Sequence, residues 1–111
     1  MIKGVGMENE LDFDNALKKI NEKGTNLVWL GIEPTGYISK LLDIDSKDIR
    51  KITPEEIIYS GKDDLKKLEE HVFVCYHGST SGFLVDYLKK THQINGYNLK
   101  GGVTSIVGEI F

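Results

Sequence analysis

Apolar and polar residues follow one another with periods that predict helices alternating with short buried strands. Residues 12–23 predict a helix, because Asp12 can cap its first turn, Gly24 can end it, and apolar side chains recur at helical spacing, namely Phe13, Ala16, Leu17 and Ile20. Residues 26–32 and 72–76 are short apolar runs rich in β-branched and aromatic side chains, which is typical of buried strands.

Helix signals also fill the region between these two strands. The sequence TPEE at residues 53–56 offers a capping threonine, a proline at the first helical position and a glutamate at the third, so we expect a helix from here to about residue 61. Residues 62–70, in which Leu65 and Leu68 are three positions apart, predict a second short helix. Residues 37–51 fit a short helix, a strand or an irregular connection.

The alternation continues to the carboxyl end. Residues 81–90 predict a helix whose core-facing side chains are Phe83, Leu84, Tyr87 and Leu88, and GYNLKGG at residues 96–102 predicts a third strand. The apolar segment 103–111 needs a surface on which to pack. Strands that alternate with helices favour a parallel α/β sheet with both faces covered.

Size and composition fit one globular domain. The 111 residues are enough for a single core, and with 40% apolar and 28% charged residues the composition is ordinary. No apolar run reaches the roughly 20 residues that span a membrane. Residues 1–10 lack the apolar centre of a secretory signal, so we expect a cytoplasmic protein without membrane association.

The charge pattern argues against a nucleic-acid partner. The net charge is −3, and acidic and basic residues are interspersed along the chain rather than gathered in blocks. A nucleic-acid surface would need clustered Lys and Arg side chains.

The single cysteine, Cys75, is the strongest candidate for chemistry. It lies where a predicted parallel strand passes through a glycine-containing loop into a helix, and functional groups collect at such carboxyl ends of strands. Backbone N–H groups of the loop and the positive end of the helix both stabilise a thiolate, and Gly78 permits the positive φ that such a curl requires. The alternative is an inert buried cysteine that serves as a small hydrophobic residue.

Two sequence blocks carry a family resemblance. CYHGSTS at residues 75–81 resembles the active-site loop of the rhodanese-like sulfurtransferases, and GYNLKGGV at residues 96–103 resembles the last core strand of that family with its double glycine. The 21 positions from Gly78 to Leu99 suit the helix that the family has between them. The resemblance implies a single rhodanese-like domain over residues 1–111, with a small central parallel sheet and helices on both faces.

The same resemblance implies a function. Cys75 would be the catalytic nucleophile that takes sulfur from a small-molecule sulfane donor, carries it as a persulfide and passes it to an external thiol, a protein acceptor or another nucleophile. No cofactor is implied. The active-site loop that would hold the anionic persulfide consists of Tyr76, His77, Gly78, Ser79, Thr80 and Ser81.

Other features of the family are missing. The family usually has Asp-x-Arg after its first buried strand, and this chain has LGIEP at residues 30–34. The family's His-Ile-x-Gly-Ala segment and the tryptophan after the double glycine are also absent. The alternative function is therefore a non-catalytic rhodanese-like binding or regulatory domain.

Two further kinds of site are disfavoured. Phosphatases on a similar scaffold need an arginine six residues after the cysteine, and this chain has Ser81 there. His71 and His92 are too scattered to form a metal site with Cys75, so no metal is expected. Within the loop, His77 is either a partly charged donor near neutral pH or an exposed histidine without a role.

Overall fold

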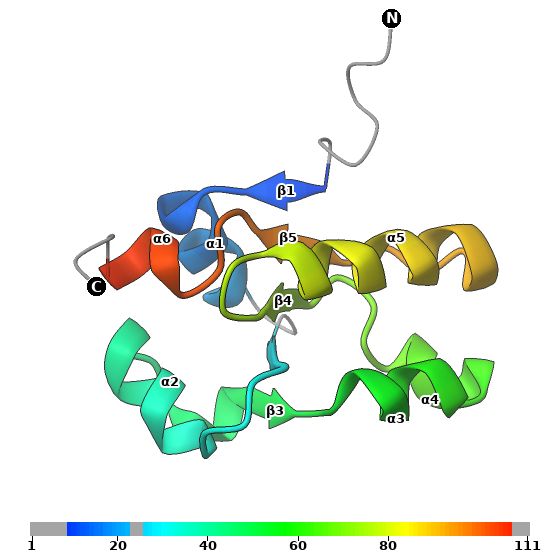
Figure 1. Ribbon diagram of the computed structural model, residues 1–111, viewed down its shortest axis with the longest axis horizontal. Helices are drawn as coiled ribbons and strands as arrows, with labels where there is room; N and C mark the ends of the chain where they lie inside the picture. The colour runs from blue at the N-terminus through cyan, green and yellow to red at the C-terminus, as the bar shows by residue number, and fades with distance from the viewer. Residues whose placement is uncertain (1–8, 23–25, 108–111) are drawn as a thin grey trace, which may run out of the picture.

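A computed structural model describes residues 9–22 and 26–107 (Figure 1). The elements in chain order are β1 (Glu10–Leu11), α1 (Phe13–Ile20), β2 (Leu27–Trp29), α2 (Thr35–Leu42), the 3₁₀ helix η1 (Ser46–Asp48), β3 (Ile49–Lys51), α3 (Pro54–Tyr59), α4 (Lys62–Lys66), β4 (Val72–Val74), α5 (Ser79–His92), β5 (Tyr97–Leu99) and α6 (Thr104–Val107).

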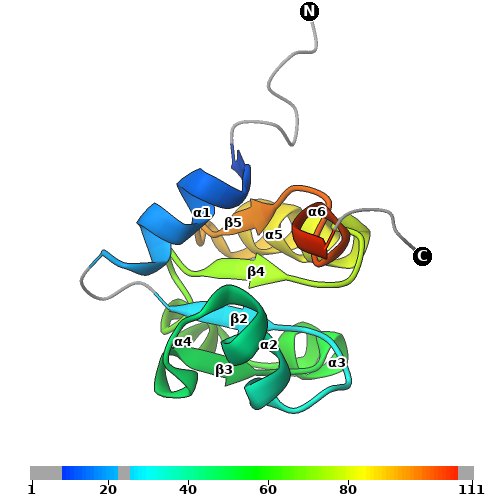
Figure 2. The same ribbon diagram turned by 90° about the vertical axis from the view of Figure 1, so that its left-hand side faces the viewer.

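The five strands form one parallel sheet in the order β1-β5-β4-β2-β3. Figure 2 shows β5, β4, β2 and β3 stacked in this order. In the centre of the sheet, Phe73 of β4 lies opposite Val28 of β2 on one side and Asn98 of β5 on the other. Because all strands run the same way, their carboxyl ends meet at one edge of the sheet.

Helices cover both faces of the sheet, and each face has its own apolar cluster. On one face, α1 and α2 pack against side chains that include Leu27, Trp29 and Val74. On the other face, α3, α4 and α5 pack against a cluster that includes Val28 and Phe73, and Cys75 belongs to this cluster. The predicted α/β fold with a small parallel sheet between helices is therefore confirmed.

Several predicted elements differ from the observed ones in their bounds. Residues 37–51, which left three possibilities open, hold most of α2 followed by η1 and the edge strand β3. The helix expected over residues 62–70 ends at Lys66, and α5 begins at Ser79, two residues before the predicted start. The prediction that Phe83 of this helix faces the core is wrong, because its side chain is 62% exposed. Strand β1 was not predicted. The expected helix stop at Gly24 and the tail after residue 107 lie outside the described residues.

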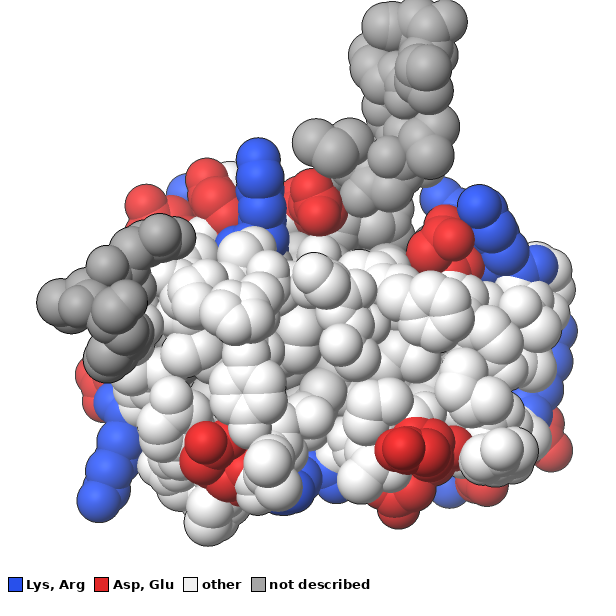
Figure 3. All heavy atoms as spheres, viewed as in Figure 1, with Lys and Arg blue, Asp and Glu red and all other residues white. Residues whose placement is uncertain are grey.

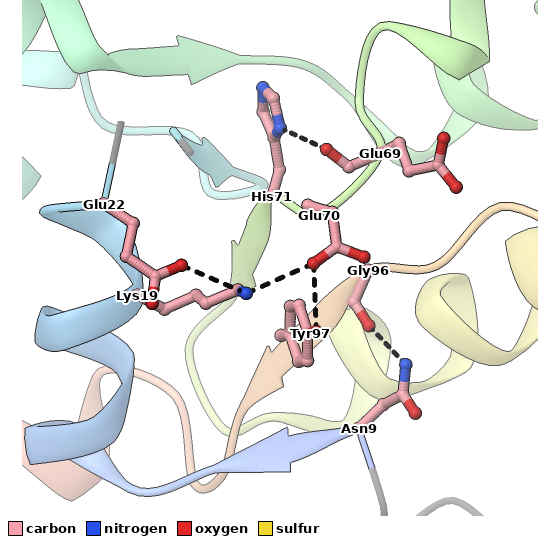
Figure 4. Close-up of polar contacts among 8 residues, drawn as sticks. All are labelled: Asn9, Lys19, Glu22, Glu69, Glu70, His71, Gly96 and Tyr97. Atoms are coloured by element: carbon pink, nitrogen blue, oxygen red, sulfur yellow. Dashed lines mark hydrogen bonds and ion pairs between the residues drawn. The ribbon is translucent and has the colours of Figure 1, made fainter. Parts of the chain in front are cut away.

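A cluster of polar side chains links α1 to the sheet at the amino-terminal ends of its strands (Figure 4). Lys19 of α1 forms ion pairs of 3.2 Å with both Glu22 and Glu70, and its ammonium group lies 4.8 Å from the centre of the Tyr97 ring. Tyr97 also donates a hydrogen bond of 3.0 Å to Glu70. These contacts connect α1, the segment before β4, and β5, at the end of the sheet opposite Cys75.

Within residues 9–22 and 26–107, no helix is both long enough and apolar enough to cross a bilayer.

Candidate functional site

Cys75 lies one residue beyond β4, at the carboxyl edge of the sheet. It is only 5% exposed, and its side chain faces the α5 side of the sheet. After it, the chain curls through residues 76–78 and enters the 14-residue helix α5 at Ser79. The positive end of the helix dipole is therefore next to the sulfur atom.

Three polar groups contact the sulfur. The backbone N–H of Gly78 donates to Cys75 Sγ at 3.1 Å, and the N–H of Ser81 donates to it at 3.3 Å. The Ser81 hydroxyl oxygen lies 3.2 Å from Sγ, and Ser81 is completely buried. The two backbone donors and the helix terminus are groups that can stabilise an anionic species at this position.

Glycines allow the loop to close against the segment after β5. Gly78 has φ 91°, a conformation that side-chain-bearing residues rarely adopt. Gly102 approaches the loop so closely that a Cβ there would be 2.3 Å from the carbonyl oxygen of Cys75. This approach lets Val103 N–H donate to that carbonyl at 2.9 Å. The double glycine therefore serves to dock two backbone segments.

Asn98 connects the loop to β5, and the sequence analysis did not single it out. Its side chain is buried, accepts a hydrogen bond from the Ser81 hydroxyl, and donates from Nδ2 to Gly78 O at 3.3 Å and to Glu10 Oε2 at 3.2 Å. The signal that could have found it is a polar residue between Tyr97 and Leu99 in a predicted strand. Glu10 gave no such signal, because β1 was not predicted.

Tyr76 points away from the sulfur, toward the loop after β2. Its hydroxyl donates to Glu33 Oε1 at 2.5 Å and accepts from Ile32 N–H at 2.8 Å. Its ring packs edge-on against Trp29 at 5.4 Å between ring centres. The hydrogen bond from Tyr76 lowers the pKa of Glu33, while burial, followed by the bond to Glu33, raises the pKa of Tyr76.

The remaining predicted loop residues lie at the surface. His77, Ser79 and Thr80 are exposed, so the structure brings Cys75, Gly78 and Ser81 together around the sulfur and leaves these three facing solvent. The arginine of the phosphatase signature is missing, because residue 81 is a serine, and its side chain is buried.

The two other histidines lie at the far ends of the elements that flank the loop. His71 precedes β4 and so lies at the opposite end of that strand from Cys75, while His92 is the last residue of α5. Among the described residues, no three His, Cys, Asp or Glu side chains are grouped to hold a metal ion.

The face that carries α5 and the loop is mostly uncharged. In Figure 3 the acidic side chains form small groups near the rim of this face, and the basic side chains lie mainly at its periphery. An anion that enters the loop would therefore meet backbone N–H groups rather than a lysine or arginine of residues 75–81.

Comparison with solved structures finds the same fold in several proteins, among them the following three. A rhodanese-like domain protein from Staphylococcus aureus has a TM-score of 0.61 at 20% identity, over 92% of this chain and 93% of that one. A rhodanese-related protein from Thermoplasma volcanium has a TM-score of 0.59 at 18% identity, over 93% and 94% of the two chains. A Staphylococcus saprophyticus protein has a TM-score of 0.59 at 16% identity, over 88% and 92%.

Sequence comparison adds nothing to this, because no family model and no curated protein matches the chain. The structural likeness extends over nearly the whole length of each protein. The chain therefore has the rhodanese-like fold.

Proposed function

We propose that the protein is a sulfurtransferase in which Cys75 carries sulfane sulfur as a persulfide. The observation that supports this most is the pair of backbone N–H groups, from Gly78 and Ser81, that donate to Cys75 Sγ at the start of α5. An inert core cysteine has no need of such donors. The rhodanese-like fold supports the same chemistry, because the fold's family includes sulfurtransferases.

The reaction would proceed in two displacements. First, the Cys75 thiolate attacks the outer sulfur of a donor such as thiosulfate, the donor's S–S bond breaks, and sulfite leaves with the bonding electron pair. A second nucleophile, such as cyanide or the thiolate of another molecule, then attacks the outer sulfur of the persulfide. The bond between the two sulfurs breaks, and its electrons return to Cys75 as a thiolate.

The loop would stabilise the charged species on this path. In the persulfide, the outer sulfur carries most of the negative charge and extends into the loop beyond Sγ. N–H groups of residues 76–81 and the positive end of α5 would then face this charge. Because Cys75 is the single cysteine of the chain, an external nucleophile must accept the sulfur.

The test is persulfide formation followed by intact-mass spectrometry. The reduced protein is incubated separately with thiosulfate and with a low-molecular-weight persulfide, because residues 75–81 contain no lysine or arginine and so leave the donor's charge open. We expect a gain of one sulfur atom that cyanide removes with release of thiocyanate. The Cys75→Ser variant is the control and should gain no sulfur.

The competing function is a non-catalytic binding or regulatory domain. The near-complete burial of Cys75 is the observation that favours it. If neither donor adds sulfur to folded protein whose Cys75 reacts with iodoacetamide, the sulfurtransferase proposal is wrong and the binding domain becomes the better description.

A further inference from the structure

Two loop residues donate N–H groups to the sulfur, and one buried side chain holds both of them. Gly78 and Ser81 are these donors, at 3.1 and 3.3 Å from Cys75 Sγ. The side-chain amide of Asn98 donates a hydrogen bond to the backbone carbonyl oxygen of Gly78 and accepts one from the hydroxyl of Ser81. We propose that Asn98, oriented by Glu10, is the positioning residue that keeps these two donors on the sulfur of Cys75. This positioning role deepens the proposed sulfurtransferase function. It rests on that function only where sulfur transfer is the quantity measured.

Asn98 is placed rigidly enough for this task. It is 2% exposed and lies in β5 between β4 and β1, where it is opposite Phe73 on one side and Glu10 on the other. Helix α5 passes directly over it, and a Cβ on Gly82 would lie 3.2 Å from Asn98 Nδ2. The missing side chain at Gly82 therefore lets the first turn of α5 rest on the amide.

The neighbours of the amide decide which way it faces. Nδ2 points at two acceptors, the backbone carbonyl of Gly78 and the carboxylate of Glu10, at 3.3 and 3.2 Å. An amide turned by half a rotation would place its oxygen against both acceptors, which is unfavourable. Glu10 thereby fixes the oxygen of Asn98 on the side of Ser81.

This orientation also determines the hydrogen of Ser81. A hydroxyl has one hydrogen, and that of Ser81 is directed to Asn98 Oδ1. The Ser81 oxygen then presents a lone pair to Cys75 Sγ at 3.2 Å and would accept the hydrogen of a protonated thiol. When sulfur is ionised, the two backbone N–H groups that Asn98 holds remain as its donors.

The discriminating variant is Asn98→Asp, which keeps the shape of the side chain and the acceptor for Ser81. The new carboxylate would face Gly78 O and Glu10 without a hydrogen to donate, and it would add negative charge beside the sulfur. We expect alkylation of Cys75 by iodoacetamide at neutral pH to slow by about tenfold or more, which is the usual scale for losing a hydrogen bond near a charged group. Persulfide formation should slow in parallel.

Asn9→Asp is the matched control. Asn9 also donates its amide hydrogen to a backbone carbonyl, that of Gly96 at 2.7 Å, at the other end of β5 (Figure 4). The control should leave the alkylation rate within about twofold of the unsubstituted protein. Glu10→Gln, whose side-chain oxygen can still accept from Asn98, should also stay close to the unsubstituted rate, whereas Glu10→Ala should be slower.

Circular dichroism and thermal unfolding would establish that each variant is folded at the assay temperature. Equal alkylation rates for folded Asn98→Asp and Asn9→Asp would overturn the role of Asn98. If Asn98→Asp fails to fold, the comparison of Glu10→Ala with Glu10→Gln decides the same point. If alkylation of Asn98→Asp is slow but the unsubstituted protein never accepts sulfur, the positioning role is supported and the sulfurtransferase function is rejected.

Discussion

Individual side chains in the loop have separable tasks, although they are neighbours in sequence. Cys75 and Ser81 face the buried network with Asn98, whereas Tyr76 reaches across to Glu33 and the backbone of Ile32. The loop is thus anchored on two sides, to β5 through Asn98 and to the segment after β2 through Tyr76. We expect that a substitution can remove the contacts of one anchor and leave those of the other in place.

Removing the Tyr76 hydroxyl tests the second anchor. In Tyr76→Phe the ring can keep its packing on Trp29, but Glu33 loses the hydrogen bond that lowers its pKa. A carboxyl group with a lowered pKa stabilises the fold above its ordinary pKa, and this stabilisation is lost as the pH falls through the folded-state value. The variant should therefore unfold at a lower temperature at neutral pH, and the difference should shrink in acid.

Thermal unfolding of both proteins across a pH series measures this effect. Alkylation of Cys75 is the companion measurement, and it should change little, because Tyr76 points away from the sulfur. A large loss of cysteine reactivity in Tyr76→Phe would mean that the two anchors act together.

Sequence reasoning grouped the loop residues that contact the Cys75 sulfur, but it did not find the side chains that hold those residues in place. The order of Cys75, Gly78 and Ser81 along the chain was enough, because a loop between a strand and a helix keeps its own residues together. Asn98 and Glu10 reach the site from two strands that are far apart in the chain. Their positions depend on strand pairing, which the hydrophobic pattern of one strand does not encode.

At the level of elements, the close contact between the segment after β5 and the loop after β4 invites a test. In Gly102→Ala, the added Cβ would collide with the Cys75 carbonyl, and φ of 58° is unfavourable for alanine. We expect a loss of at least about 2 kcal/mol in the free energy of unfolding. Urea denaturation followed by circular dichroism would measure it.

The matched control for this substitution is Gly36→Ala. Gly36 lies in α2, and a Cβ there would have no neighbour within 4 Å. Because alanine favours the helix, this variant should be neutral or more stable by up to about 1 kcal/mol. Similar losses in both variants would contradict the steric explanation.

Element boundaries were predicted best where local chemistry marks them. Helix α3 begins at Pro54 with the predicted capping box, in which Thr53 and Glu56 bond each other's backbone N–H groups. The strands β1 and β3 have only two and three residues and lie at the edges of the sheet. The central strands β2, β4 and β5 also have three residues each, but they are mostly buried, whereas β1 and two residues of β3 are not. The edge strands therefore carry too little hydrophobic pattern to be distinguished from connections, and tertiary pairing defines them.

For the whole molecule, a buried histidine should make stability depend on pH. His71 is 4% exposed, its Nδ1 lies 3.1 Å from the Glu69 carbonyl oxygen, and its Nε2 has no hydrogen-bond partner within the described structure. Figure 4 shows its ring directed away from the cluster around Lys19. Burial, with a smaller contribution from the nearby charge of Arg50, lowers its pKa.

The direction of the pH effect follows from this shift. Above the unfolded-state pKa of about 6.5, the imidazole is neutral in both states and its contribution to stability is complete. As the pH falls below that value, the unfolded chain takes up a proton that the folded protein resists, so the free energy of unfolding decreases. The decrease should level off once the pH is below the folded-state pKa.

Chemical denaturation across this pH range would measure the decrease. In His71→Leu, the share of this decrease that His71 causes should disappear. The control His77→Gln, which is altered at an exposed position, should show the same decrease as the unsubstituted protein. Parallel pH profiles for the unsubstituted protein and His71→Leu would mean that other groups cause the dependence.

The contact between Glu10 and Asn98 joins residues separated by 88 positions, close to the full length of the chain. Contacts between such distant residues require closure of a long loop, whose entropy cost is incurred before the contact contributes any stability. The support of the sulfur site is thus completed by the first strand joining the last one. A chain that has folded only through β4 and α5 would already contain Cys75 and its loop, yet it would lack the amide that steadies them, so full reactivity of the cysteine would report that assembly of the sheet is complete.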